Sequence, residues 1–97
     1  MDMEIAKIIV IKEDKVIEAF DRKVLMDSIE EIFGISMRSY SPSLISMLTD
    51  EVVKKLELVG TELYTEDIYH AVMDAMDENG YDEESMIYRL KYRKEEV

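Results

Sequence analysis

Two short apolar runs near the N-terminus decide the fold: Ile5-Ala-Lys-Ile-Ile-Val-Ile-Lys12 and Val16-Ile-Glu-Ala-Phe20. β-branched residues are frequent in both runs, and each run is too short for a confident helix, so we expect two strands. The polar residues 13–15 between them predict a tight connection. The sequence therefore predicts an N-terminal β-hairpin, although the connection lacks the Asn-Gly or Asp-Gly pair that hairpins prefer.

Two helices are expected to follow the hairpin. The first should begin after Asp21, whose carboxylate can accept the free N–H groups of a first turn, and should end at Gly34. The second should begin at Ser41-Pro42, a capping hydroxyl followed by a proline at the first helical position, and should end at Gly60. Helical spacing predicts that these apolar residues face the core: Val24, Leu25, Ile29, Ile32 and Phe33, then Leu44, Ile45, Leu48, Val52, Leu56 and Val59.

The second half of the chain predicts a short extended piece and two more helices. Residues 61–64 are able to add a third strand to the hairpin, and Thr65 with the two acids after it should open a third helix that stops at Gly80. A fourth helix is expected from near Asp82 towards Glu95, acidic at its start and basic at its end. The buried residues of the third helix should be Ile68, Ala71, Val72, Ala75 and Met76. The predicted fold class is α+β, a hairpin packed on a four-helix bundle, in a single domain covering residues 1–97.

Composition limits the classes of partner. The 97 residues are 47% apolar and 36% charged, which is typical of one soluble globular domain. The formal net charge of −11 argues against broad binding to DNA, RNA or an anionic membrane. The N-terminus carries acids where a signal peptide carries bases, so a cytoplasmic location is the default expectation, with no membrane partner. The acid-rich stretch 74–84 lacks the spacing of a calcium loop, and we expect it to be a solvated face.

The sequence carries little that indicates catalysis. The chain has no cysteine and one histidine, His70, so a transition-metal site or thiol chemistry lacks its ligands, and His70 is expected on a helix surface. With three glycines, the chain has no phosphate loop, nucleotide-fold fingerprint or nucleophile elbow. We therefore expect a protein that binds rather than an enzyme, with no catalytic residue and no protein-bound metal.

The order strand, turn, strand and four helices, with particular residues at the joints, resembles the ATP-cone domain. That domain is a regulatory module that binds adenine nucleotides in many ribonucleotide reductases and in the repressor of their genes. The similarity extends from about Ile8 to Lys94. It is carried by Val10-Ile-Lys12 with the turn after it, Phe20-Asp-Arg22, Thr65-Glu-Asp-Ile68 and Tyr92-Arg-Lys94, whose order and spacing are specific only when taken together.

The resemblance implies ATP or dATP as the ligand, with or without Mg²⁺ as a counter-ion. It implies that Val10 lies against the adenine, that Lys12 contacts the phosphates, and that Glu18 on the second strand holds the nucleotide. It also implies contacts from the Thr65 hydroxyl at the start of the third helix and from Lys94 in the last helix. This interpretation requires the two ends of the chain to converge, so that Lys12 and Lys94 face one cavity.

Two features depart from the family pattern. The family turn Lys-Arg-Asp-Gly is Lys12-Glu-Asp-Lys15 in this chain, so Glu13 replaces an arginine and the glycine is lost. Val24 stands where the family has a further lysine. Because charge-assisted contacts are worth about 1.5–3 kcal/mol each, these changes are expected to weaken nucleotide binding.

Three functions stay open at this point. The first is a regulatory module that binds ATP or dATP and thereby changes its association with itself or with a partner such as an enzyme of nucleotide metabolism. The second is a degenerate cone that no longer binds nucleotide and serves in protein–protein interaction, through its acidic body or through the tyrosines Tyr40, Tyr64, Tyr69 and Tyr81. The third is a transcription co-regulator, which would need a DNA-binding partner because the repressor's cysteine-rich segment is missing.

Overall fold

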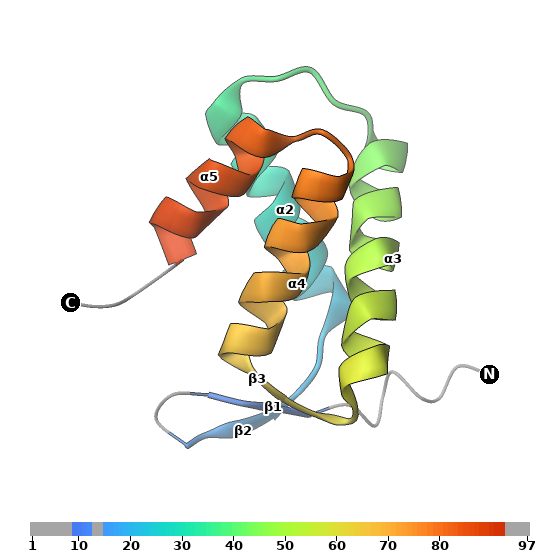
Figure 1. Ribbon diagram of the computed structural model, residues 1–97, viewed down its shortest axis with the longest axis vertical. Coiled ribbons are helices and arrows are strands. Elements are labelled where there is room, and N and C mark those ends of the chain that lie inside the picture. The colour runs from blue at the N-terminus through green and yellow to red at the C-terminus, as the bar shows by residue number, and fades with distance from the viewer. Residues whose placement is uncertain (1–8, 13–14, 93–97) are drawn as a thin grey trace.

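The computed structural model describes residues 9–12 and 15–92, which form a small three-stranded sheet at one end of four helices (Figure 1). Along the chain the order is strand, strand, helix, helix, strand, helix, helix. The predicted α+β class, a hairpin beside four helices, is confirmed. Contacts join the sheet to α3 and α4, and α5 packs against α2 and α4.

The sheet places β1 (Ile9–Ile11) between β2 (Ile17–Ala19) and β3 (Glu62–Tyr64). β1 is antiparallel to β2 and parallel to β3, so the hairpin is confirmed and the extended piece at 61–64 provides the third strand. In the connection, Lys15 adopts a left-handed φ of 71° and its N–H donates to the carbonyl of Lys12 at 2.8 Å. The predicted strand residues 5–8 and connection residues 13–14 lie outside the described residues.

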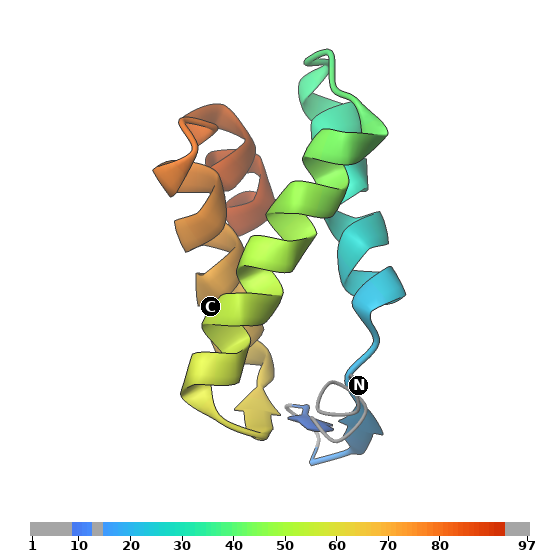
Figure 2. The ribbon, with the colours of Figure 1, turned by 90° about the vertical axis from the view of Figure 1, so that its right-hand side faces the viewer.

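The core lies between the four helices and reaches the sheet at one end of them (Figure 2). Val10 in β1 and Leu63 in β3 are register partners, and both side chains are buried. Phe20, just after β2, is buried with them. The helices complete the core with Leu25, Ile29, Ile32, Phe33, Ile45, Leu48, Val52, Val53, Leu56, Ala71, Val72, Ala75, Met76 and Tyr88.

The first helix, α2 (Arg22–Ser36), begins as predicted, because the Asp21 carboxylate accepts a hydrogen bond from a first-turn N–H at 3.0 Å. Its predicted end at Gly34 is wrong. Gly34 stays helical, and Met37 instead takes the left-handed conformation, with φ 62°. The Met37 N–H donates to the carbonyl oxygens of Phe33 and Gly34, so the last helical carbonyls are satisfied without a glycine at this position.

The second helix, α3 (Pro42–Val59), has the predicted boundaries. The Ser41 hydroxyl accepts a hydrogen bond from the Leu44 N–H at 3.2 Å, and Gly60 follows the last turn with φ 141°. Two predictions of burial are wrong, since Val24 is 63% exposed and Val59 is 56% exposed. Val59 ends α3, where the neighbouring elements no longer cover the apolar side, whereas Val24 lies on the exposed side of α2 that also carries Asp27 and Glu31.

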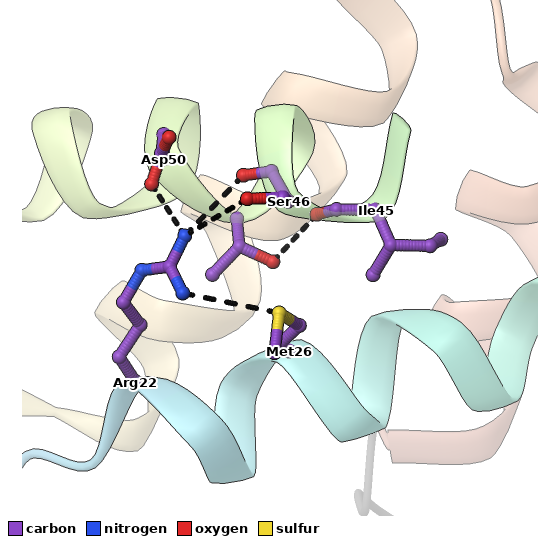
Figure 3. A network of polar contacts seen from close by, with 6 residues as sticks. Arg22, Met26, Ile45, Ser46 and Asp50 are labelled. Carbon is purple, nitrogen blue, oxygen red and sulfur yellow. Dashed lines mark hydrogen bonds and ion pairs between the residues drawn. The ribbon is translucent and has the colours of Figure 1, made fainter. Parts of the chain in front are cut away.

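A polar contact fastens the start of α2 to the middle of α3 (Figure 3). The Arg22 guanidinium donates to Asp50 Oδ1 at 2.5 Å and to the Ser46 hydroxyl at 3.4 Å. Next to Asp50 in the chain, the buried Thr49 hydroxyl donates to the Ile45 carbonyl at 2.7 Å, so its polar atom is satisfied inside the core. Arg22, part of the Phe20-Asp-Arg22 segment, therefore has a structural contact within the helices.

The last two helices are α4 (Thr65–Glu78) and α5 (Asp82–Tyr92). α4 follows β3 directly, and its N-cap is Tyr64, so Thr65 is the first helical residue rather than a cap. The chain leaves α4 as predicted, with Gly80 at φ 81°. The predicted continuation of α5 to Glu95 lies outside the described residues.

Candidate functional site

Lys12 and Thr65 lie at neighbouring positions at one edge of the sheet. Ile11 and Tyr64 are partners in the parallel pairing of β1 and β3, and Lys12 and Thr65 each follow one of them in the chain. Both positions are therefore at the carboxyl ends of parallel strands, where α4 begins. Two of the five predicted site residues are brought together by the parallel third strand.

Glu18 joins Lys12 through the hairpin. The Lys12 ammonium lies 3.4 Å from Glu18 Oε2, and the two side chains are 45% and 51% exposed. Glu18 stands opposite Val10 in the register. The Val10 side chain itself is only 7% exposed because it packs into the core, so it presents little surface to a ligand.

Acidic residues surround the start of α4. Glu66 and Asp67 lie in its first turn, and Asp67 Oδ2 accepts the Tyr64 N–H at 2.8 Å. A carboxylate at a helix N-terminus stabilises the helix, but it also occupies a donor and adds negative charge at a place where an anion would otherwise bind. Phosphate contacts at this edge would therefore depend on lysine side chains more than on the helix terminus.

Lys94 lies outside the described residues, so the predicted convergence of Lys12 with Lys94 stays a prediction. The last described turn of α5 contacts α2. The Tyr92 hydroxyl donates to Glu31 Oε1 at 3.2 Å, and the Lys91 ammonium lies 3.4 Å from Glu31 Oε2.

The sequence interpretation missed an ion pair between the α2–α3 connection and α5, in which only the carboxylate is buried. Arg38 Nε donates to Glu84 Oε2 at 2.7 Å, and the Arg38 guanidinium lies 5.1 Å from the centre of the Tyr81 ring. Glu84 is fully buried, so the prediction that residues 74–84 form a solvated face is wrong at this position. A signal was present in the sequence, because Glu84 shares a helical side with Tyr81 and Tyr88, whose rings pack on the core.

A shallow, open hollow lies on α2 and the connection after it, and none of the predicted site residues among the described residues lines it. It has a volume of about 500 Å³. Its lining consists of Asp27, Glu30, Glu31, Gly34, Ile35 and Tyr40.

Residues 9–12 and 15–92 contain neither a cluster arranged to bind a metal ion nor a helix able to span a membrane. No group of three or more histidine or acidic side chains in these ranges is arranged to hold a metal ion. His70 is an exposed residue of α4, as predicted, and its Nε2 lies 3.6 Å from Glu66 Oε2. No helix within the same ranges combines the length and the apolar character needed to cross a membrane.

Comparison with known proteins adds no relative. No family model matches the chain, and no curated protein matches it significantly. The ATP-cone resemblance therefore remains a prediction from the residues quoted above.

Proposed function

We propose that this chain is a regulatory module that binds ATP or dATP and catalyses no reaction. The observation that carries the proposal is the neighbouring location of Lys12 and Thr65 at the carboxyl ends of two parallel strands. Ligands of α/β sheets bind outside the carboxyl ends of parallel strands, and phosphate groups favour helix N-termini and ammonium groups. A lysine beside the start of α4 is thus a suitable contact for a polyphosphate.

The ion pair of Lys12 with Glu18 is compatible with this role. Both side chains are about half exposed, and a pair of this kind is worth at most about 1 kcal/mol. A phosphate group can therefore replace the carboxylate on Lys12. Glu18 would then be free to accept a hydrogen bond from a ribose hydroxyl of the nucleotide.

Mg²⁺ is expected to strengthen binding. Glu66 and Asp67 lie in the first turn of α4 and repel a nucleotide that carries several negative charges. A divalent counter-ion on the phosphates lowers that repulsion. The bound nucleotide would then change how the module associates with itself or with a partner, for which an enzyme of nucleotide metabolism is the candidate.

Titration calorimetry of the full chain with ATP and with dATP tests the proposal. Lys12→Gln is expected to weaken binding about tenfold or more, because a charge-assisted hydrogen bond is lost. Lys54→Gln is the matched control, since it removes the same charge from an exposed position of α3. An absence of heat at millimolar nucleotide, or equal losses in the two variants, contradicts nucleotide binding at this edge.

The second candidate is a docking module that has lost nucleotide binding. It is favoured by the carboxylates at the same edge, because Glu18 already pairs with Lys12 and Asp67 already accepts the Tyr64 N–H. Light scattering over a concentration series, without and with ATP, separates the candidates. If the chain associates to the same extent with and without ATP, the second candidate is supported. If association changes when ATP is added, the first candidate is supported. A chain that stays monomeric and captures no partner leaves the second candidate without support.

A further inference from the structure

We propose that Asn79 is a site of spontaneous deamidation, and that the folded end of α4 controls how fast the reaction runs. Gly80 follows Asn79, which is the only asparagine in a chain without glutamine. Because glycine has no side chain to shield its backbone nitrogen, that nitrogen can approach the side-chain amide of the residue before it closely. The one side-chain amide of this protein therefore has the neighbour that favours the reaction most.

The reaction needs water and no enzyme. The backbone nitrogen of Gly80 gives up its proton and forms a bond to Cγ of Asn79, while the bond between Cγ and Nδ2 breaks and Nδ2 leaves as ammonia with that proton. The product is a cyclic imide, which water opens at either of its carbonyl groups. One opening gives aspartate, and the other gives isoaspartate, in which the main chain runs through the side-chain carbon. Both products carry a carboxylate where the amide was.

Hydrogen bonds of the backbone hold the attacking nitrogen in place. The Gly80 N–H donates to the Asp77 carbonyl at 3.1 Å, and the Tyr81 N–H donates to the Met76 carbonyl at 2.8 Å. With Gly80 at φ 81°, these two bonds close the end of α4 as a Schellman motif. Ring closure requires rotation about the Cα–C bond of Asn79, whose ψ is 10°. That rotation breaks the bond from Gly80 to Asp77, so attack requires this turn to open.

The side chain of Asn79 is restrained as well. Its Nδ2 donates to Glu51 Oε1 at 2.9 Å and to the Ala75 carbonyl at 2.8 Å, and the residue is half-buried. Because both partners are acceptors, the nitrogen of the amide must be the atom that faces them. Cγ can reach the Gly80 nitrogen only after these bonds are released. Glu51 belongs to α3, so the packing of α3 on α4 contributes to the protection of Asn79.

Deamidation would weaken this part of the fold. The new carboxylate at position 79 loses both donated hydrogen bonds and faces the carboxylate of Glu51, and like charges at a half-buried place repel each other. Isoaspartate also lengthens the main chain inside the turn that joins α4 to α5. Because the ammonia is lost, the change is irreversible. This inference does not rest on the proposed nucleotide site.

Mass spectrometry of the intact full chain tests the proposal, after incubation in mildly alkaline buffer with and without guanidinium chloride. The chain has a single side-chain amide, so the mass gain from replacing NH2 by OH reports Asn79 alone. We expect the native reaction to be at least about tenfold slower than the reaction of the unfolded chain. Gly80→Ala should slow the reaction of the unfolded chain, because its methyl group shields the nitrogen. No reaction in denaturant, or equal rates in both conditions, would overturn the proposal.

Three variants locate the restraint. Glu51→Ala removes the acceptor on α3 and should speed the native reaction about threefold or more, with no effect in denaturant. Glu57→Ala removes the same charge from an exposed position of α3 and should leave the rate unchanged. Asp21→Ala removes the cap of α2 and lowers the stability of the whole chain without a contact to α4. If either control speeds the native reaction as much as Glu51→Ala does, the local restraint is wrong.

The modified chain tests the consequence for the fold. Ion exchange separates it from the parent by its additional negative charge. Its urea midpoint should be lower than that of the parent, and Asn79→Asp, which has the new carboxylate and an unaltered main chain, should reproduce part of the loss. Equal midpoints for the modified and parent chains would contradict the inferred weakening of the end of α4.

Discussion

Arg38 Nε donates to Glu84 Oε2 at 2.7 Å, and the Glu84 side chain has no exposed surface, whereas Arg38 is 42% exposed. The bond joins the α2–α3 connection to the first turn of α5. A buried carboxylate is costly unless a cation and hydrogen bonds compensate for its lost hydration. The packing of α5 on α2 therefore depends on a residue that lies in the connection.

Replacing Arg38 with methionine is expected to lower the free energy of unfolding by clearly more than the control change described below. Removal of the cation leaves the buried Glu84 carboxylate without compensation, and the partial exposure of Arg38 limits the loss. Urea unfolding measures the change. Lys23→Met, which breaks the exposed pair with Asp27, is the control and should cost less than about 0.5 kcal/mol.

Acidic pH should remove the contribution that Glu84 makes to the free energy of unfolding. Burial is the largest single influence on the pKa of Glu84 and would raise it, but hydrogen bonds from Arg38, from Ser36 and from the backbone, together with the charge of Arg38, outweigh burial and lower the pKa. Glu84 Oε1 has no hydrogen bond of ordinary geometry, and the nearby Ser36 hydroxyl donates to the Phe33 carbonyl, so Arg38 is the main one of the groups that lower the pKa. Stability from a group with a lowered pKa is present above the pKa of the unfolded chain and is lost as the pH falls through the folded pKa.

The measurable consequence is that the difference in the free energy of unfolding between the parent chain and Glu84→Gln becomes smaller as the pH falls. At pH 7 the parent should be more stable in urea unfolding, since its charged carboxylate makes the stronger bond with Arg38. Below about pH 4, where an ordinary glutamate is protonated, the two stabilities should approach each other. A gap that stays constant from pH 7 to pH 3 contradicts the assignment.

The sequence predicted the elements well because their signals are local. Asp21 and Ser41-Pro42 mark helix starts by hydrogen bonds within one turn, and Gly60 ends α3 at a positive φ. The partner of Glu84 is not predictable in this way, because Arg38 is 46 residues away in the chain. No local rule contains such a pairing, and an acid in a run of acids is usually solvated.

Met37 offers a direct test of the corrected end of α2. It has φ 62° and is 88% exposed, so its side chain adds strain without burial. Met37→Gly should raise the free energy of unfolding by about 0.5–1 kcal/mol, because glycine adopts the left-handed region without steric cost. Gly80→Ala replaces a glycine at a φ of 81° and should lower the free energy of unfolding by about 1 kcal/mol. Thermal unfolding of both variants measures the difference.

The candidate nucleotide site was only partly predictable from the sequence. The proximity of Lys12 and Thr65 follows from the parallel pairing of β1 with β3, which short strands do not specify by themselves. The resemblance supplied both residues, and the structure adds that Glu18 pairs with Lys12 and that Val10 is buried in the core. The acids at the start of α4 stabilise the helix, but their effect on an anionic ligand is the opposite.

Val24→Lys should strengthen ATP binding if nucleotide binds near the hairpin as proposed. The Val24 side chain is 63% exposed and contributes little to the core, so a lysine fits without loss of packing, and lysine is also the better helix former. The family pattern has a lysine at this position, and one added cation near a phosphate chain is expected to raise the affinity for ATP about threefold to tenfold.

The control is Ser43→Lys, which adds the same charge at an exposed position in the first turn of α3. It should change the affinity for ATP less than twofold, within about 0.4 kcal/mol. Calorimetry with ATP compares the affinities of the two variants with that of the parent. Equal gains in affinity in both variants would mean that the added charge acts at long range rather than at a nucleotide site near Val24.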